Sequence, residues 1–218
     1  MIHTLQLGIG FKAKLVIGII WAPFFLAQLL EHHVGIVRTH VGNIGVTEGQ
    51  LAQSAVMLAC TILGSDIYNT PINEVLGVIG YGDLLSPDYQ LRDIVVVILT
   101  LNGAMYSLFL IAEMILSIET VMGKLECLFR MIPLVMLAMF LYLTDPNDQF
   151  SAKHGALLLI AGGLTFTICT TKLIISTMAL MPYSGIQLES FIFGAYFYAQ
   201  YNLTGKDHDK NQKYAFIF

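Results

Sequence analysis

The sequence has few charged residues, and this scarcity excludes several classes of protein. Asp, Glu, Lys and Arg make up 12% of the 218 residues, about half the share of a soluble domain. The net charge is -4 and no stretch is strongly basic, so we expect no nucleic-acid partner. Hydrophobic residues make up 56% of the chain, which excludes an intrinsically disordered protein.

Cysteine is also scarce, and the common catalytic motifs are missing. Cys60, Cys127 and Cys169 form no C-x2-C pair and lie in apolar stretches, so we predict buried thiols and neither a disulfide framework nor a zinc site. The sequence has no G-x-S-x-G, P-loop, H-E-x-x-H or G-x-G-x-x-G motif, which are signatures of hydrolases, nucleotide-binding proteins and zinc proteases. A polytopic membrane protein is the class that remains, in agreement with a mean hydropathy of +0.71.

Long apolar stretches predict an all-α, polytopic membrane helix bundle. A transmembrane helix needs about 20 mostly apolar residues, and the chain has about six such stretches. The predicted spans are about 15–30, 50–63, 94–118, 128–144, 155–181 and 186–201. We interpret 1–205 as a single transmembrane domain and 206–218 as a polar tail. The stretch 65–92 has an apolar middle too short to span, which predicts an interfacial or re-entrant element.

Small residues within two spans predict close helix packing. Ala161-Gly162-Gly163 and Asn102-Gly103-Ala104 offer little side-chain bulk. In membranes, such small residues let neighbouring helix backbones approach each other. We therefore expect Gly103→Leu and Gly162→Leu to disrupt assembly.

Polar residues within the predicted spans are candidate functional residues, because a charged side chain in the bilayer core is costly. Asn102 and Glu113 lie in 94–118, and Lys172 lies in 155–181. The simpler interpretation of Glu113 is a carboxylate near the helix end that is paired or snorkels to the membrane surface, alongside Glu119. Lys172 lies deeper, so it must pair, reach water or contact a lipid phosphate. A small channel or transporter built on Glu113 and Lys172 is one hypothesis, although the chain shows no inverted repeat.

A second polar group lies at the end of the first span. Glu31, His32 and His33 are consecutive, and His40 and Glu48 follow. Such residues can bind metals or move protons. Adjacent histidines point about 100° apart on a helix, which is poor geometry for a zinc site. The alternative is a set of polar residues that end a helix at the membrane interface, and we predict no metal site here.

Two stretches resemble the choline and ethanolamine phosphotransferases of the CDP-alcohol phosphotransferase family. In 30–50, the residues that match are Glu31, His33 and Gly35, followed by the triplet Thr47-Glu48-Gly49. In the fifth span the match is Thr170-Thr171-Lys172-Leu173-Ile174-Ile175, followed by Met178. The later predicted spans also fall where the later helices of that family fall. The histidine that follows the second motif in the family is Thr177 here, which weakens any role carried over from it.

The catalytic signature of this family is absent from the chain. The family carries D-G-x2-A-R-x8-G-x3-D-x3-D, whose aspartates hold two divalent cations that grip the diphosphate of the CDP-alcohol. The 218 residues contain no D-G-x2-A-R and no D-x3-D, and Asp145 and Asp148 have the wrong spacing. On this alignment Met1 falls shortly after the last metal-binding aspartate, so the chain corresponds to the later helices of the family without their reaction centre.

The resemblance implies two further functional hypotheses. The first is a catalytically inactive, lipid-contacting structural subunit of a larger membrane complex. Glu31, His33, Glu48 and Lys172 would then contact lipid headgroups, and there would be no catalytic residue and no metal. The second is one part of an active phosphotransferase that transfers phosphocholine or phosphoethanolamine from a CDP-alcohol to diacylglycerol. Mg²⁺ or Mn²⁺ would then be held by catalytic helices supplied elsewhere.

The expected partners are phospholipids and other membrane subunits, whichever of these two hypotheses holds. The resemblance implies the endoplasmic reticulum or Golgi. A structural subunit of a large complex is equally expected in the mitochondrial inner membrane.

Overall fold

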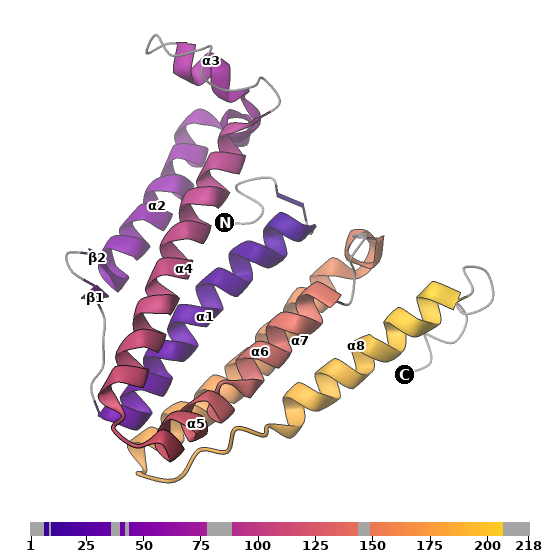
Figure 1. The fold of residues 1–218 in the computed structure, drawn as a ribbon. Helices are drawn as coiled ribbons and strands as arrows, with labels where there is room; N and C mark the ends of the chain where they lie inside the picture. The colour runs from indigo at the N-terminus through magenta and orange to yellow at the C-terminus, as the bar shows by residue number, and fades with distance from the viewer. Residues whose placement is uncertain are drawn as a thin grey trace. The chain divides into compact units, whose positions relative to one another are not determined.

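The computed structural model describes residues 7–8, 10–35, 40–41, 44–77, 89–143 and 149–206. It divides the chain into two compact units, Met1–Ser117 and Ile118–Phe218, which are described separately below. Both units are built mainly from helices (Figure 1).

In the described part of the first unit, three long helices are accompanied by short elements. They are α1 (Phe11–Val34), α2 (Val46–Leu63) and α4 (Leu91–Ser117). A two-stranded antiparallel sheet of β1 (His40–Val41) and β2 (Ile44–Gly45) precedes α2, and the 3-10 helix η1 (Ser65–Asn69) and the short helix α3 (Ile72–Gly77) follow it. Helix α1 is followed by Gly35, whose φ of 74° places it in the left-handed region where glycine is favoured.

Helices α1 and α4 run side by side (Figure 1) and form the core of this unit. Leu29 and Leu30 of α1 and Leu110 and Met114 of α4 are fully buried. Gly103 lies at the closest approach, because a Cβ atom there would be 2.9 Å from the backbone oxygen of Ile19. The predicted close packing at Gly103 is therefore present, between α4 and α1.

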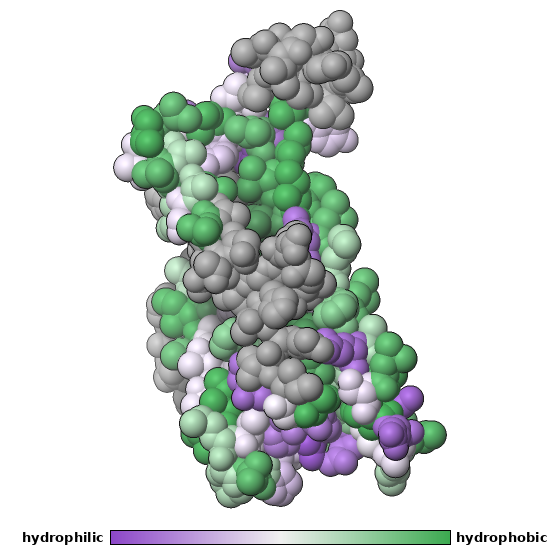
Figure 2. Space-filling view, turned by 90° about the vertical axis from the view of Figure 1, so that its left-hand side faces the viewer, coloured by the Kyte–Doolittle hydropathy of each residue, from purple (hydrophilic) through white to green (hydrophobic). Residues whose placement is uncertain are grey.

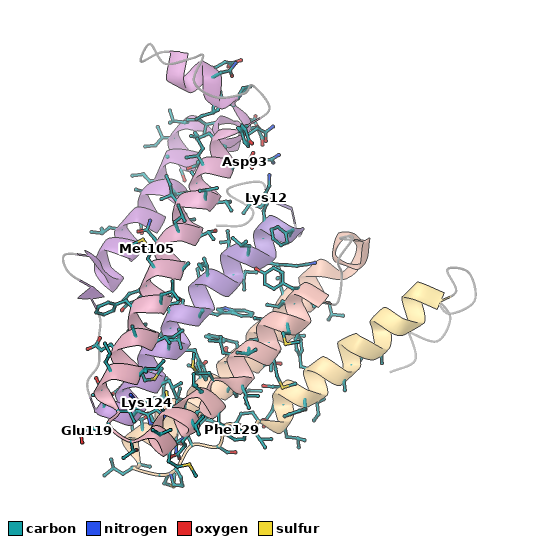
Figure 3. The ribbon with its side chains drawn as sticks, viewed as in Figure 1. Lys12, Asp93, Met105, Glu119, Lys124 and Phe129 are labelled. Atoms are coloured by element: carbon teal, nitrogen blue, oxygen red, sulfur yellow. The ribbon has the colours of Figure 1, made fainter. Side chains whose placement is uncertain are left out.

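Polar contacts fix the start of α4. Figure 3 shows Lys12 of α1 beside Asp93 of α4, and their ion pair is 2.6 Å long. The other carboxylate oxygen of Asp93 accepts a hydrogen bond from the backbone N–H of Gln90 at 3.2 Å, which caps the helix. Gln90 also forms an antiparallel bridge with Pro71. Within the predicted element at 65–92, residues near 71 and near 90 are therefore paired. This element contains η1 and α3, and 78–88 lies outside the described residues.

The described residues of the second unit form four helices. They are α5 (Val121–Arg130), α6 (Ile132–Leu143), α7 (Gln149–Met178) and α8 (Leu188–Lys206). Helices α6, α7 and α8 contact one another, and α5 contacts α6. Their core is mainly leucine, with Leu141 of α6 and Leu158 and Leu173 of α7 almost fully buried. Gly162 is also buried.

The all-α membrane-type fold predicted from the sequence is present, with differences in its spans. Within the described residues, three helices are long and apolar enough to cross a membrane, namely α1, α4 and α7. The predicted span 128–144 is divided between the end of α5 and α6, with Met131 alone between the two helices, and it stays a prediction as a span. The total of six spans stays a prediction, and 207–218 lies outside the described residues. Hydrophobic side chains cover much of the face drawn in Figure 2.

Candidate functional site

Lys172 forms an interhelical ion pair where α7 and α8 come together. Its Nζ atom lies 2.5 Å from Oε1 of Glu189 and donates a longer hydrogen bond of 3.4 Å to Oε1 of Gln187. The side chains of Lys172 and Glu189 are 46% and 32% exposed. The sequence allowed three surroundings for Lys172, and the structure provides the first, a paired carboxylate.

The end of α7 brings these residues together. Leu180 has a φ of 53°, and the N–H of Met181 donates to the carbonyl of Ser176 at 2.8 Å. This is the Schellman arrangement that ends a helix. The chain then turns through Pro182 to the start of α8, so that residues 172 and 189 face each other across the turn.

Gln187 directly precedes α8, and hydrogen bonds hold both its backbone and its side chain in place. Its backbone carbonyl accepts hydrogen bonds from the N–H groups of Ser190 and Phe191 at 3.1 and 3.4 Å. Its side-chain amide donates to the backbone oxygen of Ser184 at 2.6 Å, so the amide oxygen is free to face Lys172. Gln187 is 6% exposed. Its conformation is therefore held by packing as well as by hydrogen bonds.

Small polar groups form the buried floor of the site. The thiol of Cys169 lies 3.4 Å from the hydroxyl of Ser190. The hydroxyl of Thr170 donates to the carbonyl of Phe166 at 2.6 Å, so it is satisfied by its own helix. Tyr183, in the connecting loop, is also buried, and burial raises the pKa of its phenol well above its usual range. The floor therefore stays uncharged at neutral pH.

The Lys172 ammonium could bind an anion, and in the structure it binds the carboxylate of Glu189. A half-exposed ammonium lies beside the N-terminus of α8, and helix N-termini favour negative charge. Glu189 supplies that charge within the chain. A lipid phosphate would compete with Glu189 for Lys172, or bind at the exposed side of the pair.

The other predicted headgroup contacts lie in the first unit. Glu31 and His33 are in the last turn of α1, where the rings of His32 and His33 are edge-to-face with centroids 5.7 Å apart. Glu48 lies in the first turn of α2. All three stand at helix ends, as the interfacial interpretation predicts. Their contact with lipid stays a prediction.

The polar residues predicted within the third span lie on α4. The side-chain amide of Asn102 donates to the carbonyl of Ile98 at 2.9 Å. This bond to its own helix satisfies one of the amide donors without a partner helix. Glu113 lies one turn from the end of α4 and is partly buried. Its position agrees with the simpler of its two interpretations.

The described residues do not fit the dinuclear metal centre of the phosphotransferases. No group of three or more His, Cys, Asp or Glu residues in the described part of the chain could hold a metal ion. The sequence itself lacks D-x3-D. We therefore assign no step of a metal-dependent transfer to this chain.

Sequence reasoning missed Gln187, Glu189 and Ser190 as partners of the fifth span. The signal available was the P-Y-S-G turn at 182–185, because such residues favour a reversal of the chain. A reversal at that point returns Glu189 toward Lys172. The distance between the two side chains, however, depends on the register of α7 against α8, which no local pattern fixes.

No family model, curated protein or solved structure matches the chain. The resemblance to the CDP-alcohol phosphotransferases therefore stays a prediction that depends on the two motifs quoted above.

Proposed function

We propose that the chain is an integral membrane protein, related to the CDP-alcohol phosphotransferases, that acts as a non-catalytic, lipid-contacting subunit of a larger membrane complex. The observation that carries this proposal is the apolar surface of α4, which the described residues of the first unit leave largely uncovered.

Helix α4 is the most apolar of the three membrane-length helices and the least covered. Only 11% of its most apolar 18-residue stretch is buried, against 39% for α1. Leu101, Met105 and Leu108 are among its exposed side chains. Soluble monomers rarely expose contiguous apolar surface of this extent. Acyl chains or the helices of partner subunits would cover such a surface in a membrane.

The ion pair of Lys172 and Glu189 supports a role in lipid contact. Both partners are partly exposed, and a lysine near the membrane surface attracts anionic lipid phosphates. The match of Lys172 to the second family motif agrees with this role. Glu31, His33 and Glu48 are proposed as further headgroup contacts on the same grounds of resemblance.

A non-catalytic role is supported by the chemistry that phosphoryl transfer needs. Without divalent cations, the charge that develops on the diphosphate has no electrostatic clamp. The 218 residues contain no pair of aspartates with the metal-binding spacing. The alternative is a chain that completes an active phosphotransferase together with catalytic helices supplied elsewhere. The family motifs around Glu48 and Lys172 favour this second function.

Purification of the tagged chain in a mild detergent, followed by mass spectrometry of all co-purified proteins and lipids, tests the proposal. We expect a large complex with bound phospholipid, in which no chain carries the D-G-x2-A-R signature. The identities of the partner chains then assign the compartment, either the endoplasmic reticulum and Golgi or the mitochondrial inner membrane. A monomer without protein partner or lipid would contradict the proposal.

The same purification distinguishes the alternative. Recovery with one partner that carries D-G-x2-A-R, together with magnesium-dependent transfer to diacylglycerol, would favour the active enzyme. A Lys172→Met variant tests the lipid contact, with Thr171→Val as a control at the neighbouring exposed position. We expect Lys172→Met to retain less anionic phospholipid than the control does.

A further inference from the structure

We propose that α5 is an interfacial helix whose exposed apolar face inserts into the headgroup–acyl boundary of the bilayer. This inference depends on the membrane insertion proposed above. It replaces the predicted single span at 128–144 with an element that lies on the membrane, followed by a separate helix.

Helix α5 is amphipathic, and its apolar face is uncovered. Val121 and Met122 are 75% and 77% exposed, and Leu125, Leu128 and Phe129 are exposed on the same side. At 100° per residue, these five side chains fall within a sector of about 120°. A sector of that width is typical of a helix that buries one face, yet the described residues of the second unit leave this face open.

The remainder of α5 is either charged or fixed to the protein. Arg130 and Glu126 form an ion pair of 2.5 Å on one flank. Cys127 is fully buried, so the helix is anchored on the side away from its apolar sector. Gly185 packs against the backbone at the C-terminal end of α5, because a Cβ atom there would lie 2.8 Å from the carbonyl carbon of Phe129. The helix is thus held in place by the α7–α8 loop.

The place of α5 in the chain favours a membrane surface as the partner. Residues 118–120 alone separate it from the end of α4, a helix long enough to cross a bilayer. Three extended residues reach at most about 11 Å, so α5 begins within the interfacial layer if α4 spans. The chain enters α6 directly after Met131. An amphipathic helix between two apolar helices fits the headgroup layer, where its charged flank meets lipid phosphates and water.

Depth-dependent fluorescence quenching tests this inference on the full chain. Trp21, the single tryptophan, is first replaced in a Trp21→Phe background. Leu125→Trp then reports on the apolar face of α5, and Glu126→Trp is the matched control on its charged flank. Met105→Trp, in the middle of α4, reports membrane insertion independently. The protein is reconstituted in phosphatidylcholine–phosphatidylglycerol vesicles that carry brominated lipids.

We expect the Leu125→Trp indole about 5–10 Å below the headgroup boundary, with about two-fold stronger quenching by bromine near the start of the acyl chain than near its end. Glu126→Trp should be quenched weakly by both lipids. Met105→Trp should be quenched best by bromine near the chain end, since the hydrocarbon core is about 30 Å thick. Val121→Trp repeats the measurement on the same face, in case Leu125→Trp does not fold.

Three outcomes would overturn the inference, and each has a separate signature. Quenching of Met105→Trp without quenching of Leu125→Trp or Val121→Trp would mean that protein or water covers the face of α5. Strongest quenching of Leu125→Trp by the deep bromine would place α5 within a span. No quenching of Met105→Trp would refute membrane insertion itself, and the proposed function together with it.

Discussion

Replacement of Gly103 by leucine should separate α1 from α4 and destabilise the first unit. A Cβ atom at Gly103 would lie 2.9 Å from the backbone oxygen of Ile19, and closer still to Cγ1 of that residue. The Ile19 side chain can rotate away, but its backbone belongs to α1 and moves only with the helix. To restore ordinary contact at 3.4 Å, α1 must shift by about half an ångström for the Cβ atom alone.

The expected magnitude follows from the atoms added. Overpacking of a well-packed contact costs about 1–3 kcal/mol. Leucine adds three more carbon atoms beyond Cβ, so we expect the upper end of that range or more. Replacement of glycine within a helix recovers roughly 0.5–1 kcal/mol of backbone entropy. The net loss in the free energy of unfolding is therefore about 2 kcal/mol or more.

The measurement is a titration of the detergent-solubilised protein with SDS, followed by the fluorescence of Trp21. This tryptophan lies on α1, two residues after Ile19, so its emission reports on the contact directly. Ala112→Leu is the matched control, because Ala112 lies on an exposed part of α4. Unfolding of Gly103→Leu at the same SDS fraction as the control would refute the close contact. In the Gly103→Leu background, Ile19→Ala should restore part of the lost stability. It removes the clash with the Ile19 side chain, while the clash with the Ile19 backbone oxygen remains.

Three further predictions concern the second unit. Lys172→Met should lower the free energy of unfolding by less than about 1 kcal/mol, because the ion pair with Glu189 is partly exposed. A double-mutant cycle with Glu189→Gln measures the coupling energy of the pair, and a value above about 3 kcal/mol would contradict its exposure to solvent. Burial raises the pKa of the Cys127 thiol from 9.0 to about 11, so the unfolded chain loses the thiol proton at a lower pH than the folded chain does. The free energy of unfolding should therefore fall as the pH rises from about 9 to 11, and the fall should be smaller in Cys127→Ala. Leu180→Gly should raise the thermal midpoint, because a left-handed conformation costs a non-glycine residue about 1–2 kcal/mol; a lower midpoint would contradict the strain at φ 53°.

The sequence was sufficient to predict the class of the protein and the place of its longest helices. Low charge and long apolar stretches restrict the fold to structures that satisfy every backbone hydrogen bond internally. The predicted spans 15–30, 94–118 and 155–181 correspond to α1, α4 and α7. The small residue Gly103 also pointed to a close helix contact, although its partner helix could not be named.

Tertiary structure decided which polar groups meet and where an apolar run is broken. The partner of Lys172 is 17 residues away, and its identity depends on the register of α8 against α7. The run 128–144 is continuous in hydropathy, yet α5 and α6 are separate helices. Gly185 packs on the end of α5 and Cys127 is buried, so contacts with residues distant in sequence fix the end of α5. Hydropathy records how much a residue favours an apolar medium. It carries no information on the direction of the chain after each turn, which is set by contacts between residues distant in sequence.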